Sequence, residues 1–466
     1  MTLDPTLLRA VVLVVPAALC VALWLWRRPE GRQITALCLA TLWQLPPLLL
    51  LNVIAADAGW WTFSAEGGLL WGVPMELLAG WMLLWGAAPV MAFPRLNPAA
   101  IAAGALLLDL VLIPQCRPVI DLSGRWLLGE VLCIVLALLP GIALARWTEQ
   151  RRNLIGRALL QAAGFAGLIL WVLPAVILSQ TGGDLTVMLS RPTWALFIGV
   201  QVLFLFAVLG LSAVQELARR GRGTPLPQDP TQRLVYSGPY AYLANPMQIS
   251  VALLLGGLGA LMGSAQVAGA GLMVIVFSAG LADWHEGELL KARFGALYVA
   301  WRQQVRPWLP RWRPWVPFQA TLYYAEGCTP CEGLARWVSS KRPVGLVLVP
   351  AQDHPARDLT RLTYDPGDGS AEEEGIVALA HALEHIHLGF ATLGWLMRLP
   401  GIAALVQMVV DAAGGGPRLV PRRALSTDTA EIGAAPSGSD VDDLAEISPG
   451  QPGAGEVGTG QVGTDE

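Results

Sequence analysis

Long runs of uncharged, apolar residues constrain the fold of this chain more than any other feature. Runs of about 20 apolar residues, the length that a helix needs to cross the hydrocarbon core of a bilayer, can be placed about nine times. Only 14% of the 466 residues are charged, against about 25% in an ordinary soluble chain. Because lipid cannot satisfy exposed backbone groups, such runs must form helices. The sequence therefore predicts a mainly α, polytopic membrane helix bundle of about nine spans, at 7–26, 34–55, 68–92, 98–115, 124–145, 157–180, 193–217, 247–264 and 266–284.

Basic residues are distributed unevenly among the loops that join these spans. The loop at 56–67 contains neither Lys nor Arg, whereas the loops after the first, fifth and seventh spans are rich in Arg. Loops rich in Lys and Arg stay in the cytoplasm. We therefore expect an integral protein of a bacterial-type inner membrane, with its N-terminus outside and every residue after 285, including a C-terminal domain, in the cytoplasm. The basic loops contain Arg27, Arg28 and Arg32; Arg146, Arg151, Arg152 and Arg157; and Arg219, Arg220, Arg222 and Arg233.

Changes in composition divide the chain into four blocks. Residues 1–185 are membrane helices of unknown role, and 186–316 add a span, a loop rich in Pro and Gly, and a tight pair of spans. Residues 317–420 are less apolar, and we expect a cytosolic α/β domain there. Residues 421–466 are rich in Gly, Ser, Asp and Glu and are predicted to form a disordered tail, because they cannot bury enough apolar surface to fold. No basic patch with interleaved aromatic residues indicates a nucleic-acid partner.

The loop before the eighth predicted span combines residue types that suit a charged ligand. A Gly-Pro pair favours a turn with exposed backbone, two tyrosines offer aromatic faces and hydroxyl groups, and an Asn-Pro pair begins the next helix. A helix hairpin returns the chain to the membrane face that it left, so we expect a His-Glu pair at its end to lie close to this loop. The residues concerned are Gly238, Pro239, Tyr240, Tyr242, Asn245, Pro246, His285 and Glu286.

The same loop and a second motif after the hairpin together resemble the membrane-embedded methyltransferases of the isoprenylcysteine carboxyl methyltransferase and phospholipid methyltransferase group. The second motif comprises Phe294-Gly295, Tyr298 and Arg306-Pro307, and the resemblance covers about residues 220–315. It implies S-adenosylmethionine as the methyl donor, a lipophilic or isoprenoid small-molecule acceptor among the membrane lipids, and lipid modification as the outcome. It also implies that the loop and hairpin residues just named bind the cofactor, and that Tyr242, Asn245 and Glu286 are catalytic.

The chain departs from the family pattern at positions within these motifs. The family usually carries Arg where this chain has Ala244, and an aromatic residue often stands where it has Gln248. Of the paired acids of the family, Glu286 is present and Gly287 replaces the second, while Glu288 is one position out of register. These positions belong to the part of the chain that the resemblance assigns to cofactor binding.

A dithiol motif marks the start of the C-terminal domain. Cys328-Thr329-Pro330-Cys331 follows a strand-like run at 320–324 and precedes a helical stretch at 332–340 and a second strand at 344–349. This order is the opening of a thioredoxin fold. It resembles the DCC-type thiol-disulfide oxidoreductase domains, although Ala325 and Glu326 replace their Asp-Gly. We expect Cys328 and Cys331 to form a reduced, cycling dithiol that meets a thiol-redox partner.

Other histidines and acids leave further hypotheses open. His381, His385 and His387 are expected on a solvated helix face, so we predict no metal site. One alternative function is a membrane-anchored thiol-disulfide oxidoreductase whose membrane part is a degenerate methyltransferase scaffold. Another is a polyisoprenoid-pathway protein in which acids inside the predicted spans do the chemistry, because buried carboxylates in lipid usually face a partner or a cavity. These acids are Glu76, Asp109 and Glu130.

Overall fold

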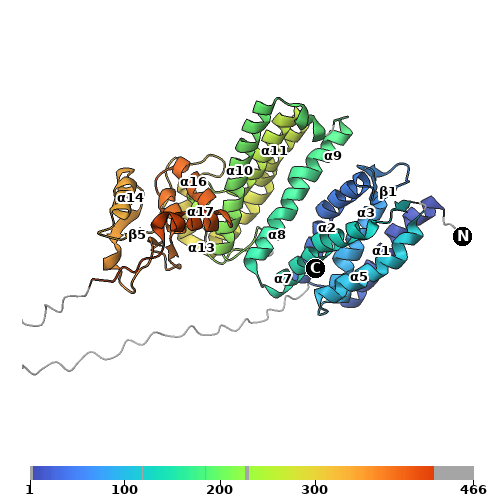
Figure 1. The fold of residues 1–466 in the computed structure, drawn as a ribbon, viewed down its shortest axis with the longest axis horizontal. Helices are drawn as coiled ribbons and strands as arrows, with labels where there is room; N and C mark the ends of the chain where they lie inside the picture. Colours follow the sequence, from blue (N-terminus) through green and yellow to red (C-terminus); the bar gives the residue numbers. More distant parts are fainter. Residues whose placement is uncertain (1–3, 118, 184, 226–229, 424–466) are drawn as a thin grey trace, which may run out of the picture. The chain divides into compact units, whose positions relative to one another are not determined.

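The computed structural model of this chain describes residues 4–117, 119–183, 185–225 and 230–423, and for 281–286 it describes only the backbone. Most of the described chain is helical (Figure 1). The tail predicted to be disordered lies outside the described residues from position 424 onward.

Seven helices in the described part of the chain are long and apolar enough to cross a membrane. Three of them contain a wider π-helical turn, at Leu83–Ala87, Ile134–Leu138 and Gly167–Val172, and each turn comes shortly before a proline. Proline lacks the N–H that an α-helical turn needs, and its ring displaces the carbonyl one turn earlier, so the helix locally widens. The seven are α1 (Pro5–Arg27), α2 (Arg32–Asp57), α3 and α4 (Met75–Met82, Ala88–Ala92), α5 (Pro98–Leu112) with its 3-10 extension to Cys116, α6 and α7 (Trp126–Cys133, Leu139–Gln150), α8 and α9 (Leu154–Ala166, Leu173–Gln180) and α10 (Thr193–Arg219).

The last two predicted spans form a hairpin of shorter helices. These are α11 (Pro246–Met262) and α12 (Ala265–Phe277), which a π-helical turn extends to Ala282. At 1.5 Å per residue, the 17 residues of α11 cover about 25 Å, less than a hydrocarbon core of about 30 Å. The prediction of about nine full-length spans is therefore too high, although every predicted segment contains a helix. Gly263, with φ of +69°, forms the turn between the two helices.

The basic loops lie together at one end of the helix bundle. Arg146 donates a hydrogen bond of 3.2 Å to the carbonyl oxygen of Phe93, and the Gln33 side chain donates one of 3.1 Å to Glu149. The loops with few basic residues meet at the other end, where β1 (Trp61–Phe63) pairs antiparallel with β4 (Ile120–Leu122). Near them, β2 (Leu69–Leu70) and β3 (Val73–Pro74) form a second short pair. This segregation supports an integral membrane protein; the cytoplasmic location of the basic end stays a prediction.

The C-terminal block contains a four-stranded mixed sheet in the order β6-β5-β7-β8. The parallel strands β5 (Ala320–Tyr324) and β6 (Leu346–Pro350) are joined across the sheet by α14 (Thr329–Ser340), as parallel strands require. Strand β7 (Thr363–Asp365) pairs antiparallel with β5, and β8 (Glu373–Glu374) pairs antiparallel with β7. The buried side chains of Leu322, Val338 and Leu346 pack between the helix and the sheet.

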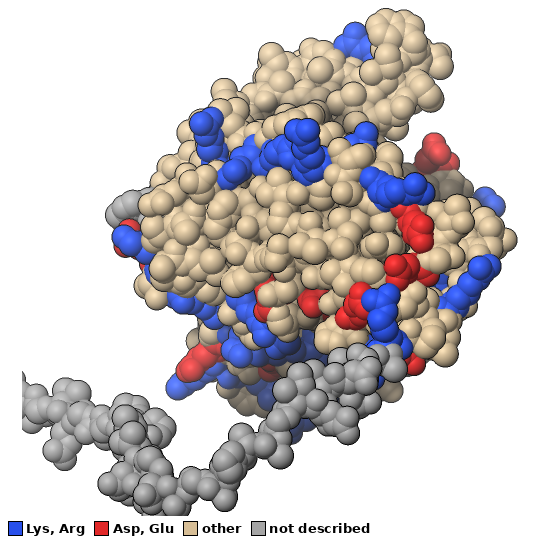
Figure 2. Space-filling model, turned by 90° about the vertical axis from the view of Figure 1, so that its left-hand side faces the viewer, with Lys and Arg blue, Asp and Glu red and all other residues tan. Residues whose placement is uncertain are grey.

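Three helices close this block: α15 (Ile376–Glu384), α16 (Leu388–Arg398) and α17 (Ile402–Val410). α16 packs against the membrane helix α10, and Trp395 lies in one apolar cluster with Val208. The chain bends by 92° between α16 and α17, a pair that would count as an eighth, broken span by composition alone. In the face that Figure 2 shows, Lys and Arg form a band toward the top, Asp and Glu gather with further Lys and Arg toward the lower right, and a broad area between them is uncharged.

Candidate active site

The loop between α10 and α11 is shaped by one close approach. It contains a 3-10 turn, Gly238–Ala241, that begins at a glycine with φ of +56°. A Cβ atom at Gly238 would lie 3.3 Å from the side chain of Glu216 on α10. Its positive φ favours glycine here, and a side chain would also crowd Glu216. Pro246 then occupies the first turn of α11, where its missing N–H is not needed, and Asn245 precedes it as the N-cap residue.

The helix after the hairpin turns back toward this loop. α13 (Asp283–Gln304) bends at Gly295, whose φ of +56° and ψ of −133° are accessible almost only to glycine. Beyond the bend, the indole N–H of Trp301 donates a hydrogen bond of 3.0 Å to the carbonyl oxygen of Tyr240. The N–H of Ala244 donates one of 2.9 Å to the carbonyl oxygen of Arg306. The two motifs, which are far apart in sequence, are thus in direct contact.

An aromatic cluster fills the contact between the two motifs. Tyr240 and Trp301 are buried in it with Tyr298 and Ala244, and the rings of Tyr298 and Trp301 lie 5.8 Å apart. A Cβ atom at Gly287 would lie 3.8 Å from the Tyr298 hydroxyl, which is its one neighbour within 4 Å among the side chains that the structure describes. The position at which the resemblance led us to expect a second acid is therefore next to a tyrosine hydroxyl.

The remaining predicted site residues divide into two groups. His285 and Glu286 lie in the first turn of α13, but their side chains lie outside the described residues, so their role stays a prediction. Tyr242, in contrast, is fully buried, and its hydroxyl donates a hydrogen bond of 2.6 Å to the carbonyl oxygen of Glu384. Burial, with the nearby Glu384 carboxylate, raises the pKa of Tyr242, so this hydroxyl keeps its proton. In this structure Tyr242 joins the loop to the C-terminal block.

A chain of buried charges makes the same connection, and the sequence did not reveal it. Arg398 of α16 lies between Glu384 of α15, at 2.6 Å, and Glu216 of α10, which it also contacts directly. The Ser237 hydroxyl of the loop donates a hydrogen bond to Glu216, and Arg220 lies 3.9 Å from the same carboxylate. The formal charges of the two carboxylates and two guanidinium groups cancel, which makes their burial tolerable.

The histidines of α15 are buried, so the prediction of a solvated face is wrong for His381 and His385. They are 2% and 6% exposed. The loop between α10 and α11 and helix α16 pack over the side of α15 that was predicted to face solvent. His385 donates from Nδ1 to the carbonyl oxygen of Val344 and accepts at Nε2 from the Tyr364 hydroxyl. His387 is partly exposed and stacks on Trp312.

A cleft lies between the loop that joins α10 to α11 and the C-terminal block. On one side, the Tyr236 hydroxyl donates a hydrogen bond of 2.9 Å to Asp368. The cleft is lined by loop residues Tyr236, Ser237, Gly238 and Ala241, by Arg220, by Pro314, Trp315, Val316, Pro317 and Phe318 of the connecting segment, and by Tyr364, Pro366, Asp368, His381, Glu384 and His385 of the C-terminal block.

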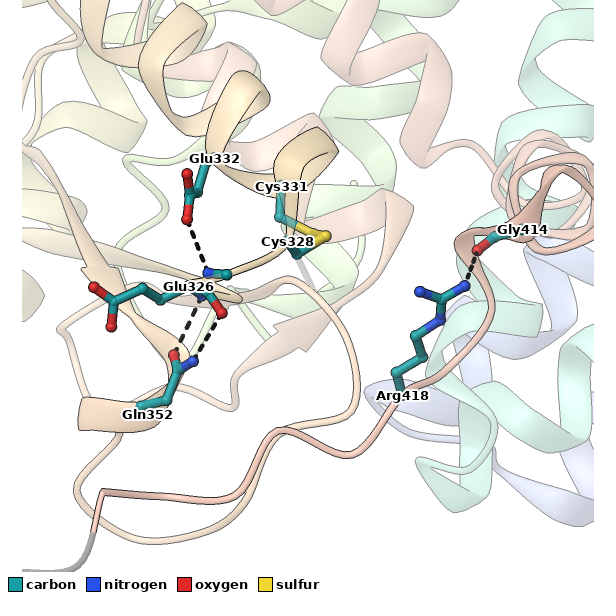
Figure 3. The surroundings of a disulfide bond; sticks show 8 residues. Glu326, Cys328, Cys331, Glu332, Gln352, Gly414 and Arg418 are labelled. Atoms are coloured by element: carbon teal, nitrogen blue, oxygen red, sulfur yellow. Dashed lines mark hydrogen bonds between the residues drawn. A yellow bond between two sulfur atoms is a disulfide. The ribbon is translucent and has the colours of Figure 1, made fainter.

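The dithiol motif lies in a preformed turn at the start of α14 (Figure 3). Cys328 is the N-cap residue of that helix and forms a disulfide with Cys331, with 5.2 Å between their Cα atoms. The side chain of Gln352 bonds to both the N–H and the carbonyl of Glu326, at 3.3 and 3.0 Å. Glu332 accepts from the N–H of Gly327 at 2.8 Å. The structure contains the oxidised form, and the expected reduced form stays a prediction.

The acids of the N-terminal bundle lie away from this region. Glu76 is paired with Arg9 at 2.9 Å. Asp109 and Glu130 are 2% and 3% exposed, and their carboxyl groups contact each other inside the bundle. The structure brings none of the three acids to the loop between α10 and α11.

Comparison with known proteins bears on the middle of the chain. Residues 194–296 match the family described as Phospholipid methyltransferase. The match begins in α10, includes the loop and the α11–α12 hairpin, and ends just past the bend at Gly295. No curated protein and no solved structure matches the chain. The match supports a membrane methyltransferase and leaves the N-terminal bundle and the C-terminal block unassigned.

Replacing Gly295 by Ala should lower the free energy of unfolding by about 1–3 kcal/mol, because a side chain disfavours its backbone conformation. Thermal unfolding in detergent would measure this. The control is Gly256→Ala in α11, where nothing lies within 4 Å of a new Cβ atom; it should be neutral or slightly stabilising. Equal effects of the two substitutions would contradict the role assigned to the bend.

Replacing Tyr242 by Phe should destabilise the protein by about 1 kcal/mol, because the carbonyl oxygen of Glu384 loses its buried donor. The matched control is Tyr324→Phe in β5, whose hydroxyl makes none of the hydrogen bonds described for this chain. Denaturation curves of the two variants would compare them. A Tyr242→Phe protein as stable as the control would show that the hydroxyl does not hold the loop to the C-terminal block.

Proposed function

We propose that this protein is an S-adenosylmethionine-dependent membrane methyltransferase, similar to the isoprenylcysteine carboxyl methyltransferases, that acts on a lipophilic acceptor at the cytoplasmic membrane face. The observation that carries the proposal is the contact between the two motifs, through Trp301 and Tyr240 and through Ala244 and Arg306. The family match covers the loop side of this contact and α13 as far as residue 296, so Trp301 and Arg306 lie just beyond it.

The residues around the bend of α13 fit such a donor. Its positive sulfonium suits aromatic faces and carboxylates, and its polar ends suit hydroxyls and free backbone groups. Gly287 lies beside the Tyr298 hydroxyl, which belongs to the aromatic cluster. The donor would be bound there by the hairpin end, with His285 and Glu286, and by the loop at Gly238, Pro239, Tyr240, Asn245 and Pro246. Tyr242, whose hydroxyl is already bonded to Glu384, would support the loop from beneath.

The bound donor supplies an activated methyl group, and the protein's task is to position it. Methyl transfer is an in-line displacement, so holding donor and nucleophile in line accounts for most of the rate. A helix hairpin whose outer surface is apolar gives a lipophilic acceptor access from the bilayer: Leu272, Met273 and Phe277 of α12 are exposed on it. The acceptor would present its nucleophile at the basic end of the bundle, beside the loop.

Transfer of a labelled methyl group from S-adenosylmethionine into a lipid extract tests the proposal. The purified protein should label a lipid, and Glu286→Ala should lower the rate at least about 100-fold, because that acid is proposed to hold the donor. Glu288→Ala, two positions along α13, is the matched control and should retain activity, as should Cys328→Ser. Equal activity of the Glu286 and Glu288 variants would contradict the proposed site.

A second candidate function rests on the disulfide at the start of α14. The strand order β6-β5-β7-β8 and the crossover helix support a thioredoxin-like, DCC-type dithiol domain. The protein would then be a membrane-anchored thiol-disulfide oxidoreductase. The absence of any labelled lipid, together with a reversible two-electron couple that Cys331→Ser abolishes, would favour this function over the first.

A further inference from the structure

One side chain in the cleft between the loop and the C-terminal block has the geometry of a proton acceptor. His381 lines this cleft opposite Ser237, Gly238 and Ala241 of the methyltransferase-like loop. Its Nδ1 lies 3.5 Å from a carboxylate oxygen of Glu384. Its Nε2 is buried and has no hydrogen-bond partner among the described residues.

The neighbours of His381 fix its ring. Tyr364 stacks on it with 4.7 Å between ring centroids and 7° between the planes. Glu384, which faces Nδ1, is itself held by Arg398 at 2.6 Å. A carboxylate can only accept, so Glu384 favours the tautomer with the proton on Nδ1, which leaves the lone pair on Nε2. A carboxylate that orients a histidine in this way is the arrangement of a catalytic base.

The charge around His381 keeps the ring neutral. Burial, and next the Arg398 guanidinium, hold its pKa well below 6.5, while Glu216 acts in the opposite direction. The other titratable or charged groups that face it are Glu384 and His385 on α15, Arg220 on α10 and Tyr364 on β7. At neutral pH the imidazole is therefore neutral, the form in which a histidine acts as a general base.

His385 shows that this arrangement is specific to one histidine. It lies one turn along the same helix and is also buried, but both of its ring nitrogens are occupied, by Val344 and Tyr364. Satisfied nitrogens on both sides are what a structural histidine needs. An unpartnered buried nitrogen is costly to keep, so its presence beside the cleft indicates a group that binds there.

We propose that His381 is the general base of the methyl transfer, so that the C-terminal block completes the active site. This inference rests on the proposed methyltransferase function. The acceptor's O–H, N–H or S–H group would attack the methyl carbon, and the methyl–sulfur bond would break with its electron pair left on sulfur. The acceptor's proton would pass to Nε2 of His381 and from there to water. The acceptor is therefore a hydroxyl, amine or thiol compound, since a carboxylate has no proton to remove.

The experiment compares the pH dependence of labelled-methyl transfer into a lipid extract for the wild-type protein, His381→Gln and the control His385→Gln. Wild-type kcat should fall on acidification with a midpoint below 6.5, as His381 takes up a proton. His381→Gln should lower kcat by about 10²–10⁴-fold and lose this acidic limb, with KM for the donor nearly unchanged. His385→Gln should lose stability but keep the limb.

Each result separates the two proposals. A wild-type protein that transfers no methyl group overturns the proposed function and the base with it. A wild-type protein that transfers methyl groups at a rate independent of pH overturns the base alone, even if His381→Gln fails to fold. Transfer by a folded His381→Gln protein at the wild-type rate, or with its acidic limb intact, does the same.

Discussion

The buried chain of Glu216, Arg398 and Glu384 is the interaction on which the arrangement of the site depends. Removing charges from water is costly, and only close partners of opposite sign offset this cost. Here the partners come from a membrane helix and from two helices of the C-terminal block. Loss of one member would leave an uncompensated buried charge, which typically costs about 3–5 kcal/mol. These three buried charges therefore specify one way in which α10, α15 and α16 pack together.

This packing supports the loop from both sides. Glu216 accepts a hydrogen bond from the Ser237 hydroxyl and lies close to Gly238. These two contacts hold the loop against the end of α10. From the other side, the Tyr242 hydroxyl reaches the backbone of Glu384. The bend at Gly295 then brings Trp301 against Tyr240. The membrane helices, α13 and the C-terminal block each fix part of one small region, which is how an enzyme that works by positioning must be built.

Much of this was predictable from the sequence. Apolar runs located the membrane helices, and the return of a hairpin to its starting face predicted that the two motifs meet. The bounds of the last two segments, 247–264 and 266–284, were also predicted to within two residues at each end. Only their status as full-length spans was wrong, because the 17 residues of α11 fall short of the hydrocarbon core. The ion chain could not be predicted, since Glu216 and Arg398 are 182 positions apart and only the fold pairs them. His381 and His385 are four residues apart, a pattern typical of a solvated helix face, and only the packing of α16 and the loop around them shows that they are buried.

A double-mutant cycle on Glu216 and Arg398 tests most directly whether this ion chain joins the membrane part to the C-terminal block. Thermal and denaturant unfolding of Glu216→Gln, Arg398→Met and the double variant would give the three changes in free energy. We expect the double variant to be more stable than the sum of the single changes predicts, by more than about 1 kcal/mol, because it removes both charges together. Additivity within about 0.5 kcal/mol would contradict the account, since the two side chains would then be independent.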